Sequence, residues 1–546
     1  LPEGGIYTRT DYRMKGLDVR ATATYNTSID NTHIINLFGG FENSSIDRTR
    51  SWFRGWGYQY DKGGTPFYDY NVFKQGKEEN TNYYTNEATY TRSVAFFFMG
   101  TYSYKGIYTL TGTGRYEGTN RLGKSRSARW LPTWNVAGAW NVHEEKFYSN
   151  FTNPVLSHAT LKASYSLTAD RGPAFVTNSQ AILNSYSPWR PSASVTESGM
   201  RITELENSEL TYEKKHEFNV GIDLGFLKNR LNLAADYYRR NNFDLIGVIN
   251  TQGAGGTIAK YANIASMKSS GIELTISSKN MRTKDFSWNT DFIFSKTKNE
   301  ITDLKSHANV LSLISGNGFG REGYPVRGLF SIPFAGLTED GLPTFINQDG
   351  QKTISSFNFQ EYEKLDFLKY EGPTDPTITG SFGNILTYKN LKLNVFVTYS
   401  FGNVIRLDPV FSNAYSDLDA MPKEFKNRWM KAGDENVTNI PTIVSTRMNQ
   451  QYAYLNMAYN AYNYSDVRIA DGGFIRLKEI SLSYDLPAKV INFFRLNKLQ
   501  LKLQATNLCL LYADSKLNGQ DPEFFRSGGV STPVPKQFTF TVRLGL

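Results

Sequence analysis

The feature that most constrains this chain is a strict alternation of apolar and polar residues in segments of about ten residues. Residues 17–25 show it plainly, because Leu17 and Val19 interleave with Asp18 and Arg20. Other segments repeat the pattern, and they cover residues 134–142, 160–167, 217–226, 391–400, 499–504 and 538–546. Successive side chains of a β-strand point to opposite faces, so each segment predicts a strand with one apolar and one polar face.

The composition excludes helical membrane spans. The longest apolar run of the 546 residues, from Val94 to Met99, is far shorter than the ~20 residues that a spanning helix needs. Hydrophobic residues make up 40% of the chain and aromatic residues 14%. This aromatic content is too high for a disordered protein. Since only helices and closed barrels satisfy their backbone hydrogen bonds in lipid, any membrane role requires a barrel.

The connections between the predicted strands favour a barrel over a soluble β-sandwich, which also alternates. Lys105-Gly106 and Lys389-Asn390 form tight hairpin turns, whereas residues 117–133, 169–216, 241–271 and 401–473 form long connections. Outer-membrane barrels have short turns at one rim and long loops at the other. We expect roughly sixteen to eighteen strands, a number typical of channels and transporters.

The charged residues and the single cysteine indicate no nucleic-acid or disulfide chemistry. The net charge of +9 is spread along the chain without a basic tract, so nucleic acid is not an expected partner. Cys509 lies in an apolar string, where it reads as a small hydrophobic residue. The chain begins at Leu1 without a charged and then apolar leader, so we expect it to be part of a longer product.

Several phrases follow one another in an order that is typical of one protein family. They are GRYEGTNRLGKSRSARWLPTWNVAGAWNVHEEKF from Gly114, NSELTYEKKHEFNVGIDLGF from Asn207, ASMKSSGIELTI from Ala265, FIRLKEISLSYDLP from Phe474 and QATNLCLLYADSKLNGQDPEF from Gln504, and PVPKQFTFTVRLGL ends the chain. In this order they resemble the SusC/RagA family of TonB-linked outer-membrane transporters. Thr119-Asn120-Arg121-Leu122 stands where the family has Ser-Ser-Arg-Phe, and Leu131-Pro132 where it has Phe-Pro.

The resemblance implies an all-β fold, a large antiparallel transmembrane β-barrel, which in this family has 22 strands around an internal plug. Residues 1–546 would be its carboxy-terminal part, without the amino-terminal plug domain and the first strands. The implied function is active import of a bulky oligosaccharide or oligopeptide across the outer membrane of a Bacteroidetes-type bacterium. The implied partners are TonB with its ExbB/ExbD motor, a SusD-like surface lipoprotein that acts as a lid, and membrane lipid.

Two other functional classes stay open. A barrel of this family could instead serve as a structural subunit of a larger outer-membrane complex, with its loops as docking surfaces. The third class is an outer-membrane enzyme or a passive porin. The upstream sequence would separate them, since a plug and a TonB-contact segment support import.

No catalytic, metal or cofactor site is predicted. The histidines are scattered without the spacing of a metal site, and they are His33, His143, His158, His216 and His307. Residues 318–323 satisfy G-x-G-x-x-G but no helix pattern follows, so a plain loop is expected there. Residues 347–350 lack the repeated acidic positions of a calcium loop and are expected to form a plain turn.

Aromatic side chains supply the candidate contacts. Trp52, Trp56, Tyr58 and Tyr60 could stack on sugar rings or grip peptide side chains. The alternative is an aromatic girdle, which anchors barrels at both membrane interfaces. Phe425 and Trp429 fall in a segment, residues 420–431, with near-helical apolar spacing in the longest loop. They are candidates for contact with the lid, the alternative being packing on neighbouring loops.

Overall fold

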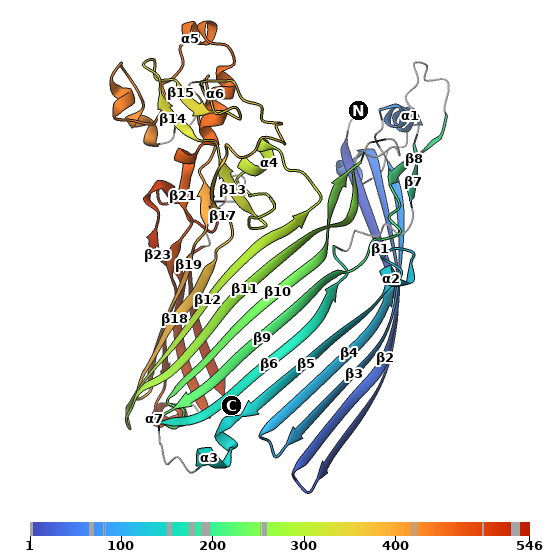
Figure 1. The fold of residues 1–546 in the computed structure, drawn as a ribbon, viewed down its shortest axis with the longest axis vertical. Helices are drawn as coiled ribbons and strands as arrows, with labels where there is room; N and C mark the ends of the chain where they lie inside the picture. The colour runs from blue at the N-terminus through green and yellow to red at the C-terminus, as the bar shows by residue number, and fades with distance from the viewer. Residues whose placement is uncertain are drawn as a thin grey trace. The chain divides into compact units, whose positions relative to one another are not determined.

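The computed structural model describes residues 4–64, 70–79, 83–149, 155–173, 181–186, 197–251, 259–416, 423–493, 496–525 and 535–545, and the single positions 81, 253, 418 and 421. One large antiparallel sheet dominates this part of the chain (Figure 1). Its strands, in spatial order, are β1 (Gly5–Ile29), β2 (His33–Tyr58), β3 (Tyr84–Tyr104), β4 (Tyr108–Thr119), β5 (Trp130–Asn141), β6 (Leu156–Asp170), β9 (Glu213–Phe226), β10 (Leu231–Asn250), β11 (Ala259–Arg282), β12 (Phe286–Leu304), β18 (Ile378–Tyr388), β19 (Leu391–Phe401), β22 (Phe474–Asp485), β23 (Lys498–Ala513) and β24 (Gln537–Gly545).

The described part of this sheet has 15 strands, slightly fewer than the expected sixteen to eighteen. The remaining strands belong to the connections, where they form small separate sheets. These are β7 (Ile182–Tyr186), β8 (Gly199–Glu204), β13 (Gly328–Ser331), β14 (Phe334–Leu337), β15 (Pro343–Ile346), β16 (Lys352–Thr353), β17 (Lys369–Pro373), β20 (Val404–Arg406) and β21 (Ile469–Asp471). Short loop strands look like wall strands in a sequence, because a hydrophobic run does not reveal its pairing partner.

The helices of the described residues are short and lie in connections. They are α1 (Tyr70–Glu78), α2 (Arg126–Arg129), α3 (Lys146–Ser149), α4 (Val310–Ile314), α5 (Thr446–Gln451), α6 (Leu455–Asn463) and α7 (Ala488–Phe493), and the 3₁₀ turns η1 (Tyr60–Lys62), η2 (Val142–Glu144), η3 (Lys423–Asn427), η4 (Asp434–Asn436), η5 (Asp466–Arg468) and η6 (Ser515–Leu517). In the described part of the chain, no helix has both the length and the apolar character that crossing a membrane requires.

The chain divides into two compact units. The first comprises Leu1–Trp140, Ala163–Phe218 and Asn241–Ser266, and the second comprises Asn141–Lys162, Asn219–Arg240 and Met267–Leu546. In the first unit, β1, β2 and β3 have 25, 26 and 21 residues, about twice the number that a tilted strand needs to cross a bilayer. These strands therefore continue beyond the hydrocarbon layer.

The register confirms the predicted faces in both units. In the first, Ala21 pairs with Phe41 and Tyr25 with Leu37 on the apolar face of β1, and Arg20 pairs with Glu42 on its polar face. In the second, the apolar residues of β23 pair directly with those of β24, as in Leu501↔Val542 and Leu503↔Phe540. In a barrel wall the apolar face meets lipid, and the polar face lines the interior.

The predicted hairpin turns are also confirmed. Lys389 has a φ of 50°, and the two residues Lys389 and Asn390 connect β18 to β19. Lys105 and Gly106 have φ of 53° and 71°, and the Ile107 N–H donates to the Tyr104 carbonyl at 2.9 Å. Left-handed residues in tight turns match the twist of the two flanking strands.

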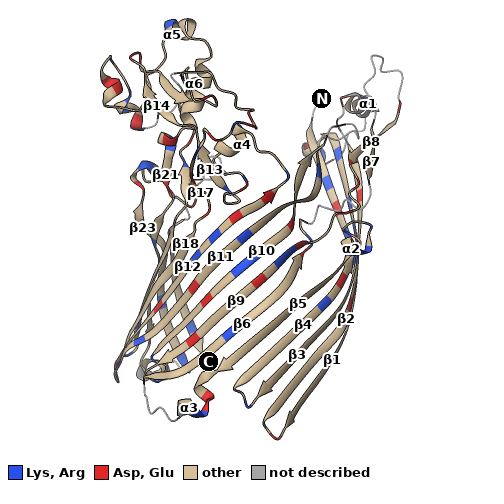
Figure 2. Cartoon of the chain, viewed as in Figure 1, with Lys and Arg blue, Asp and Glu red and all other residues tan. Residues whose placement is uncertain are grey.

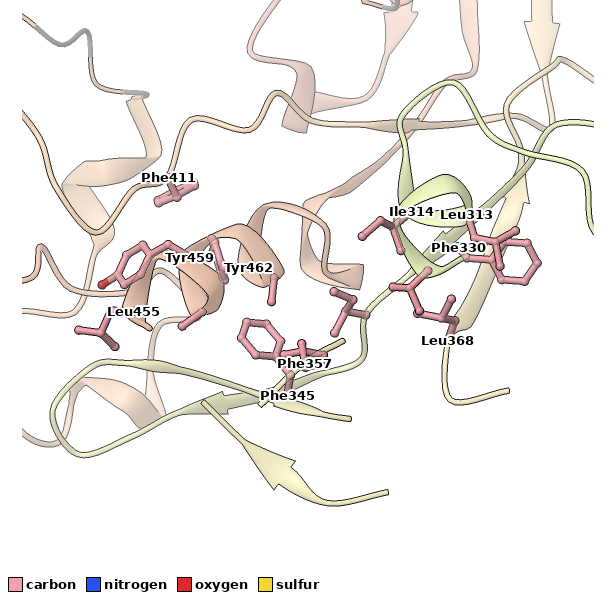
Figure 3. Packing of buried hydrophobic residues seen from close by; sticks show 14 of the residues in the cluster. Leu313, Ile314, Phe330, Phe345, Phe357, Leu368, Phe411, Leu455, Tyr459 and Tyr462 are labelled. Atoms are coloured by element: carbon pink, nitrogen blue, oxygen red, sulfur yellow. The ribbon is translucent and has the colours of Figure 1, made fainter. Parts of the chain in front are cut away.

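The long connections of the second unit have a hydrophobic core of their own, which we call the loop core. It contains Val310, Leu313 and Ile314 of α4, Phe330 of β13, Phe345 of β15, and Leu455, Ala458, Tyr459 and Tyr462 of α6, with Phe357, Leu368, Phe411 and Phe425 (Figure 3). Two small sheets, β13–β17 and β14–β15–β16, frame it. The long connections of this unit therefore pack together around a shared core and are not independent loops.

Candidate functional site: a row of ion pairs on the polar face

Lys, Arg, Asp and Glu residues recur along the strands of the large sheet (Figure 2), and a row of them lies on the polar face of the first unit. The strand register aligns Arg20 of β1 with Glu42 of β2, Glu42 with Ala95 of β3, and Ala95 with Glu117 of β4. Ala95 is only 2% exposed, so the larger charged side chains on either side close over it. A small residue at this position lets ion pairs reach across a whole strand.

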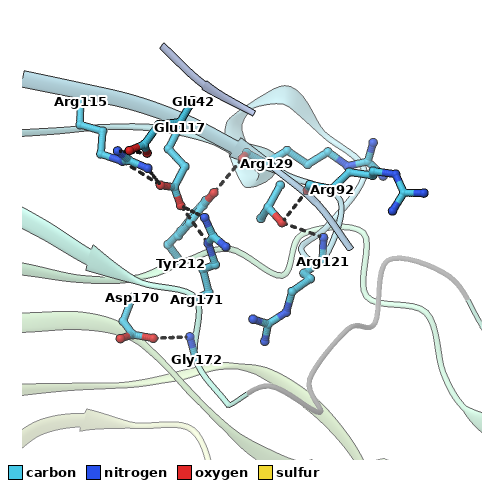
Figure 4. Close-up of polar contacts among 11 residues, drawn as sticks. Glu42, Arg92, Arg115, Glu117, Arg121, Arg129, Asp170, Arg171, Gly172 and Tyr212 are labelled. Atoms are coloured by element: carbon cyan, nitrogen blue, oxygen red, sulfur yellow. Dashed lines mark hydrogen bonds and ion pairs between the residues drawn. The ribbon is translucent and has the colours of Figure 1, made fainter. Parts of the chain in front are cut away.

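Arg115 of β4 connects the two carboxylates. One of its Nη atoms lies 2.9 Å from Glu42 Oε2, and the other lies 2.8 Å from Glu117 Oε2 (Figure 4). Arg20 Nε lies 3.3 Å from the other oxygen of Glu42. Charge-assisted hydrogen bonds of this kind are about twice as strong as neutral ones, so the row fixes the side chains of three strands.

Glu117 extends the row to the connection that follows β6. Arg171, the first residue after that strand, donates from Nε to Glu117 Oε1 at 2.8 Å, and its Nη2 also contacts this oxygen. Glu117 therefore holds one guanidinium from its own strand and one from a loop. The row of ion pairs, defined here as Arg20, Glu42, Arg115, Glu117 and Arg171, carries three cations and two carboxylates.

Two hollows adjoin this row. One has a volume of ≈ 370 Å³ and is lined by Arg20, Glu42 and Arg115 with the apolar Phe97 and Met99. The other has a volume of ≈ 590 Å³ and is lined by Arg115, Glu117, Arg121, Asp170, Arg171 and Tyr212. Volumes of 300–1,000 Å³ are usual for ligand sites. We call the second hollow the arginine cavity.

Two of the family-like phrases meet beside the arginine cavity. Leu122 and Leu210 are fully buried, and they form one hydrophobic cluster with Leu131 and Tyr212. The Gly123 N–H donates to the Leu210 carbonyl at 2.8 Å, and the Lys124 N–H donates to the Ser208 carbonyl at 2.9 Å. A Cβ on Gly123 would lie 2.0 Å from Ser208 O, so only glycine allows this approach.

Tyr212 closes this junction between residues 120–131 and 207–212. Its hydroxyl donates to the Arg129 carbonyl at 3.1 Å, and its ring is 3% exposed. Burial, which disfavours the phenolate, raises the pKa of Tyr212 to about 12. The junction therefore keeps a neutral phenol at any physiological pH.

A second buried ion pair joins two more of the phrases, in the second unit. Arg476 of β22 donates to both oxygens of Asp521 at 2.6 and 2.8 Å, and its Nη2 lies 2.7 Å from Glu523. Arg476 belongs to the phrase FIRLKEISLSYDLP, and Asp521 belongs to GQDPEF. Both side chains are almost fully buried, which makes this contact a structural tie rather than a ligand site.

The four aromatic candidates do not form one platform. Tyr58 and Tyr60 lie together, with ring centroids 4.6 Å apart, and Tyr7 stacks on Tyr58 at 5.1 Å. Trp52 lies under the guanidinium of Arg54, and Trp56 is buried. Trp52 shares the face of β2 that carries Glu42, because the two positions differ by an even number along the strand. Ligand contact by these residues stays a prediction.

Phe425 and Trp429 lie in the loop core and at its margin. The ring of Phe425 is 5% exposed and stacks on Phe411 at 5.0 Å. The Trp429 ring covers Gly341, and its Nε1 donates to Glu435 at 3.1 Å. Residues 423–427, within the segment of near-helical spacing, form the 3₁₀ turn η3, while Ala420 lies outside the described residues. Lid contact by these two side chains stays a prediction.

The sequence alone did not identify Glu42, Glu117 or Arg171 as a set. Arg115 and Glu42 are 73 residues apart, and only the strand register brings them together. The available signal was the position of Arg20, Glu42 and Glu117 on polar faces of alternating strands. Among the described residues, no group of three or more His, Cys, Asp or Glu side chains is arranged to hold a metal ion.

Comparison with known proteins agrees with this architecture. The family described as "TonB dependent receptor-like, beta-barrel" matches residues 4–508. The receptor SusC of Bacteroides thetaiotaomicron is 26% identical over 495 residues, which are 85% of this chain and 44% of SusC. The TonB-dependent receptor P3 of Formosa agariphila is 24% identical over 528 residues, which are 92% of this chain and 48% of that protein.

Solved structures show the same fold. A chain of the RagAB peptide transporter superposes with a TM-score of 0.78 at 21% identity, covering 98% of this chain and 56% of that one. The chain thus spans about half the length of the curated relatives that it matches. The family match and the likeness to both SusC and RagAB confirm the predicted SusC/RagA resemblance. The chain belongs to the TonB-dependent receptor-like β-barrel family of the bacterial outer membrane.

Proposed function

We propose that this chain forms the barrel wall of a TonB-dependent importer that moves a bulky nutrient, an oligosaccharide or an oligopeptide, across the outer membrane. The observation that carries the proposal is the charged polar face, with two hollows along one row of ion pairs, in a barrel of this family. A wall that served only as a scaffold would need no such hollows on the side that lines the interior.

TonB and its ExbB/ExbD motor would supply the energy, because the outer membrane has no ATP of its own. Their contact point would lie in a part of the protein outside this chain. A SusD-like lipoprotein would cover the long-loop rim, and the resemblance to SusC and to the RagAB transporter supports this partner. The folded loop core would offer such a lid a firm surface. We propose no catalytic step for the chain.

Uptake by living cells tests the proposal. The gene for the whole protein would be deleted from its host, and uptake of fluorescent oligosaccharides and oligopeptides would be measured with and without TonB. We expect one class of oligomer to lose uptake both in the deletion strain and in the TonB-depleted strain. Complementation with the intact gene should restore it.

The competing function is that of a structural subunit in a larger envelope complex. In that case every oligomer would enter the deletion strain at the normal rate, and the purified barrel would carry only partners that face the periplasm. Mild-detergent purification followed by mass spectrometry distinguishes these results from a barrel that is recovered with a surface lipoprotein.

A further inference from the structure

The arginine cavity contains a guanidinium that the ion-pair row does not use. Arg121 lies in the connection after β4 and lines the cavity beside Arg171 (Figure 4). Its guanidinium donates from Nη2 to the Pro173 carbonyl at 2.9 Å. Its Nε is buried and has no hydrogen-bond acceptor among the described residues.

The surroundings of Arg121 disfavour its charge. Burial and the neighbouring Arg171 both lower its pKa, and only the more weakly acting Asp170 and Tyr212 oppose them. Two half-buried cations that face one cavity repel each other, and a buried donor without an acceptor is destabilising. A negatively charged group between them would relieve both effects.

The charge balance of the cavity limits what that group can be. Its lining holds Arg115, Arg121 and Arg171 against Glu117 and Asp170, so three positive and two negative charges leave a formal net charge of +1. Glu117 already binds two guanidinium groups, and one oxygen of Asp170 accepts the Gly172 N–H at 2.8 Å. The net charge fits one carboxylate better than a doubly charged phosphate.

We propose that the arginine cavity binds a carboxylate group of an anionic oligomer, with Arg121 as the principal contact and Arg171 beside it. The guanidinium fork matches a planar carboxylate, and a cavity of ≈ 590 Å³ accommodates a sugar or amino-acid unit that carries the group. The inference deepens the proposed import function, since it gives the cargo a negative charge. An acidic sugar and an acidic peptide share this chemistry.

Binding to the purified full-length protein in detergent tests the inference without transport. The probes are trigalacturonate and terminally blocked tri-glutamate, with galactotriose and terminally blocked tri-glutamine as their carboxylate-free neutral counterparts, measured by isothermal titration calorimetry at low and high salt. We expect one acidic probe to bind and its neutral counterpart to bind at least ~10-fold more weakly, since hydrogen bonds to charged groups stabilise more than neutral ones. Whichever acidic probe binds identifies the source of the carboxylate.

Substitutions locate the site. Arg121→Gln should weaken binding of the acidic probe by ~10-fold or more, while Arg121→Lys should retain part of the affinity. Lys124→Gln is the matched control, because Lys124 lies in the same connection but pairs with Glu206 and does not line the cavity. It should bind the acidic probe like the wild type.

Equal binding of acidic and neutral probes, or an Arg121→Gln variant with wild-type affinity, would overturn the inference. Failure of the import proposal would look different, because a scaffold could still bind the acidic probe in the calorimeter while the deletion strain took up every oligomer normally. Circular dichroism, and the difference in gel mobility between unheated and boiled samples, would establish that each variant is folded before binding is compared.

Discussion

The buried pair of Arg476 and Asp521 provides the sharpest test of how this barrel holds its connections. Their side chains are 5% and 6% exposed, so Arg476→Met would leave the Asp521 carboxylate buried without its cation. Breaking a buried pair by removing one partner costs about 3–5 kcal/mol. Glu523, which also contacts Arg476, is 43% exposed, so water can solvate its carboxylate and the cost comes from Asp521.

The loss should be local, since β22 keeps its neighbours β19 and β23. We expect the segment of residues 514–525 to detach, and its internal hydrogen bonds report on this directly. The amides of Leu517 and Phe524, which donate to Asp514 and Asp521, should exchange with deuterium roughly a hundredfold faster or more. Hydrogen-exchange mass spectrometry of the protein in detergent measures this rate.

Two controls make the result decisive. Lys364→Met removes an exposed pair with Asp349 that solvent screens, so it should leave the exchange rates of residues 514–525 unchanged. The double variant Arg476→Met/Asp521→Leu should recover much of the protection, because replacing both partners leaves no buried charge. If Arg476→Met exchanged no faster than Lys364→Met, the assignment of this pair as a structural tie would be refuted.

Three further substitutions test other parts of the structure. Ile222→Arg, on the apolar face of β9, should cost ~2–4 kcal/mol in a detergent or lipid refolding assay, whereas Asn219→Arg on the polar face should be mild, and equal effects would contradict the face assignment. Gly123→Ala should separate the two phrases at the junction, since its Cβ would meet Ser208 O at 2.0 Å, and unchanged proteolysis of residues 197–212 would argue against this. Because the folded pKa of Tyr212 is raised from 10.0 to about 12, the stabilisation that its neutral phenol gives is complete below pH 10 and is lost as the pH rises through 12. Tyr212→Phe should abolish this part of the alkaline loosening, as followed by hydrogen exchange of the same segment.

The wall of the barrel could be predicted from the sequence because its physics is local. A strand that separates lipid from the interior must alternate, and residues 17–25 or 499–504 show that period without knowledge of any partner. The tight turn at Lys389-Asn390 is equally local. The faces of β1, β23 and β24 therefore followed from the sequence, and the family phrases added the order of the strands.

The ion-pair row could not be predicted, because it depends on register across strands. Shifting a strand by one residue would move Glu42 to the other face, and the sequence does not fix that register for residues so far apart. The four aromatic candidates show that closeness in the sequence does not ensure a shared surface either. Trp52, Trp56 and Tyr60 are close in the sequence, yet the irregularity of β2 at Gly57, with a φ of 75°, and the start of η1 separate Tyr60 from the two tryptophans.

The loop core changes how the proposed lid should be tested. Deleting the residues from position 419 to Glu435 would remove Phe425, whose ring stacks on Phe411 inside that core, and would expose the partners it buries. Large-to-small changes at such sites cost about 3–5 kcal/mol for a phenylalanine. Loss of a partner after the deletion would therefore report on unfolding of the loops as much as on a lost contact.

Exposed residues within and just after this stretch give a cleaner test of the lid. Met430 and Val437 are 63% and 83% exposed, and neither belongs to the loop core. If a SusD-like lipoprotein rests on this surface, Met430→Glu/Val437→Glu should place two charges in a desolvated contact and lower recovery of the lipoprotein in mild-detergent purification. The loop core should keep its hydrogen-exchange protection, because neither side chain supports it. Lys364→Glu, another exposed change in this unit, serves as the control. Undiminished recovery with the double variant would place the lid elsewhere on the rim, and recovery of no lipoprotein with the wild type would favour the structural-subunit function.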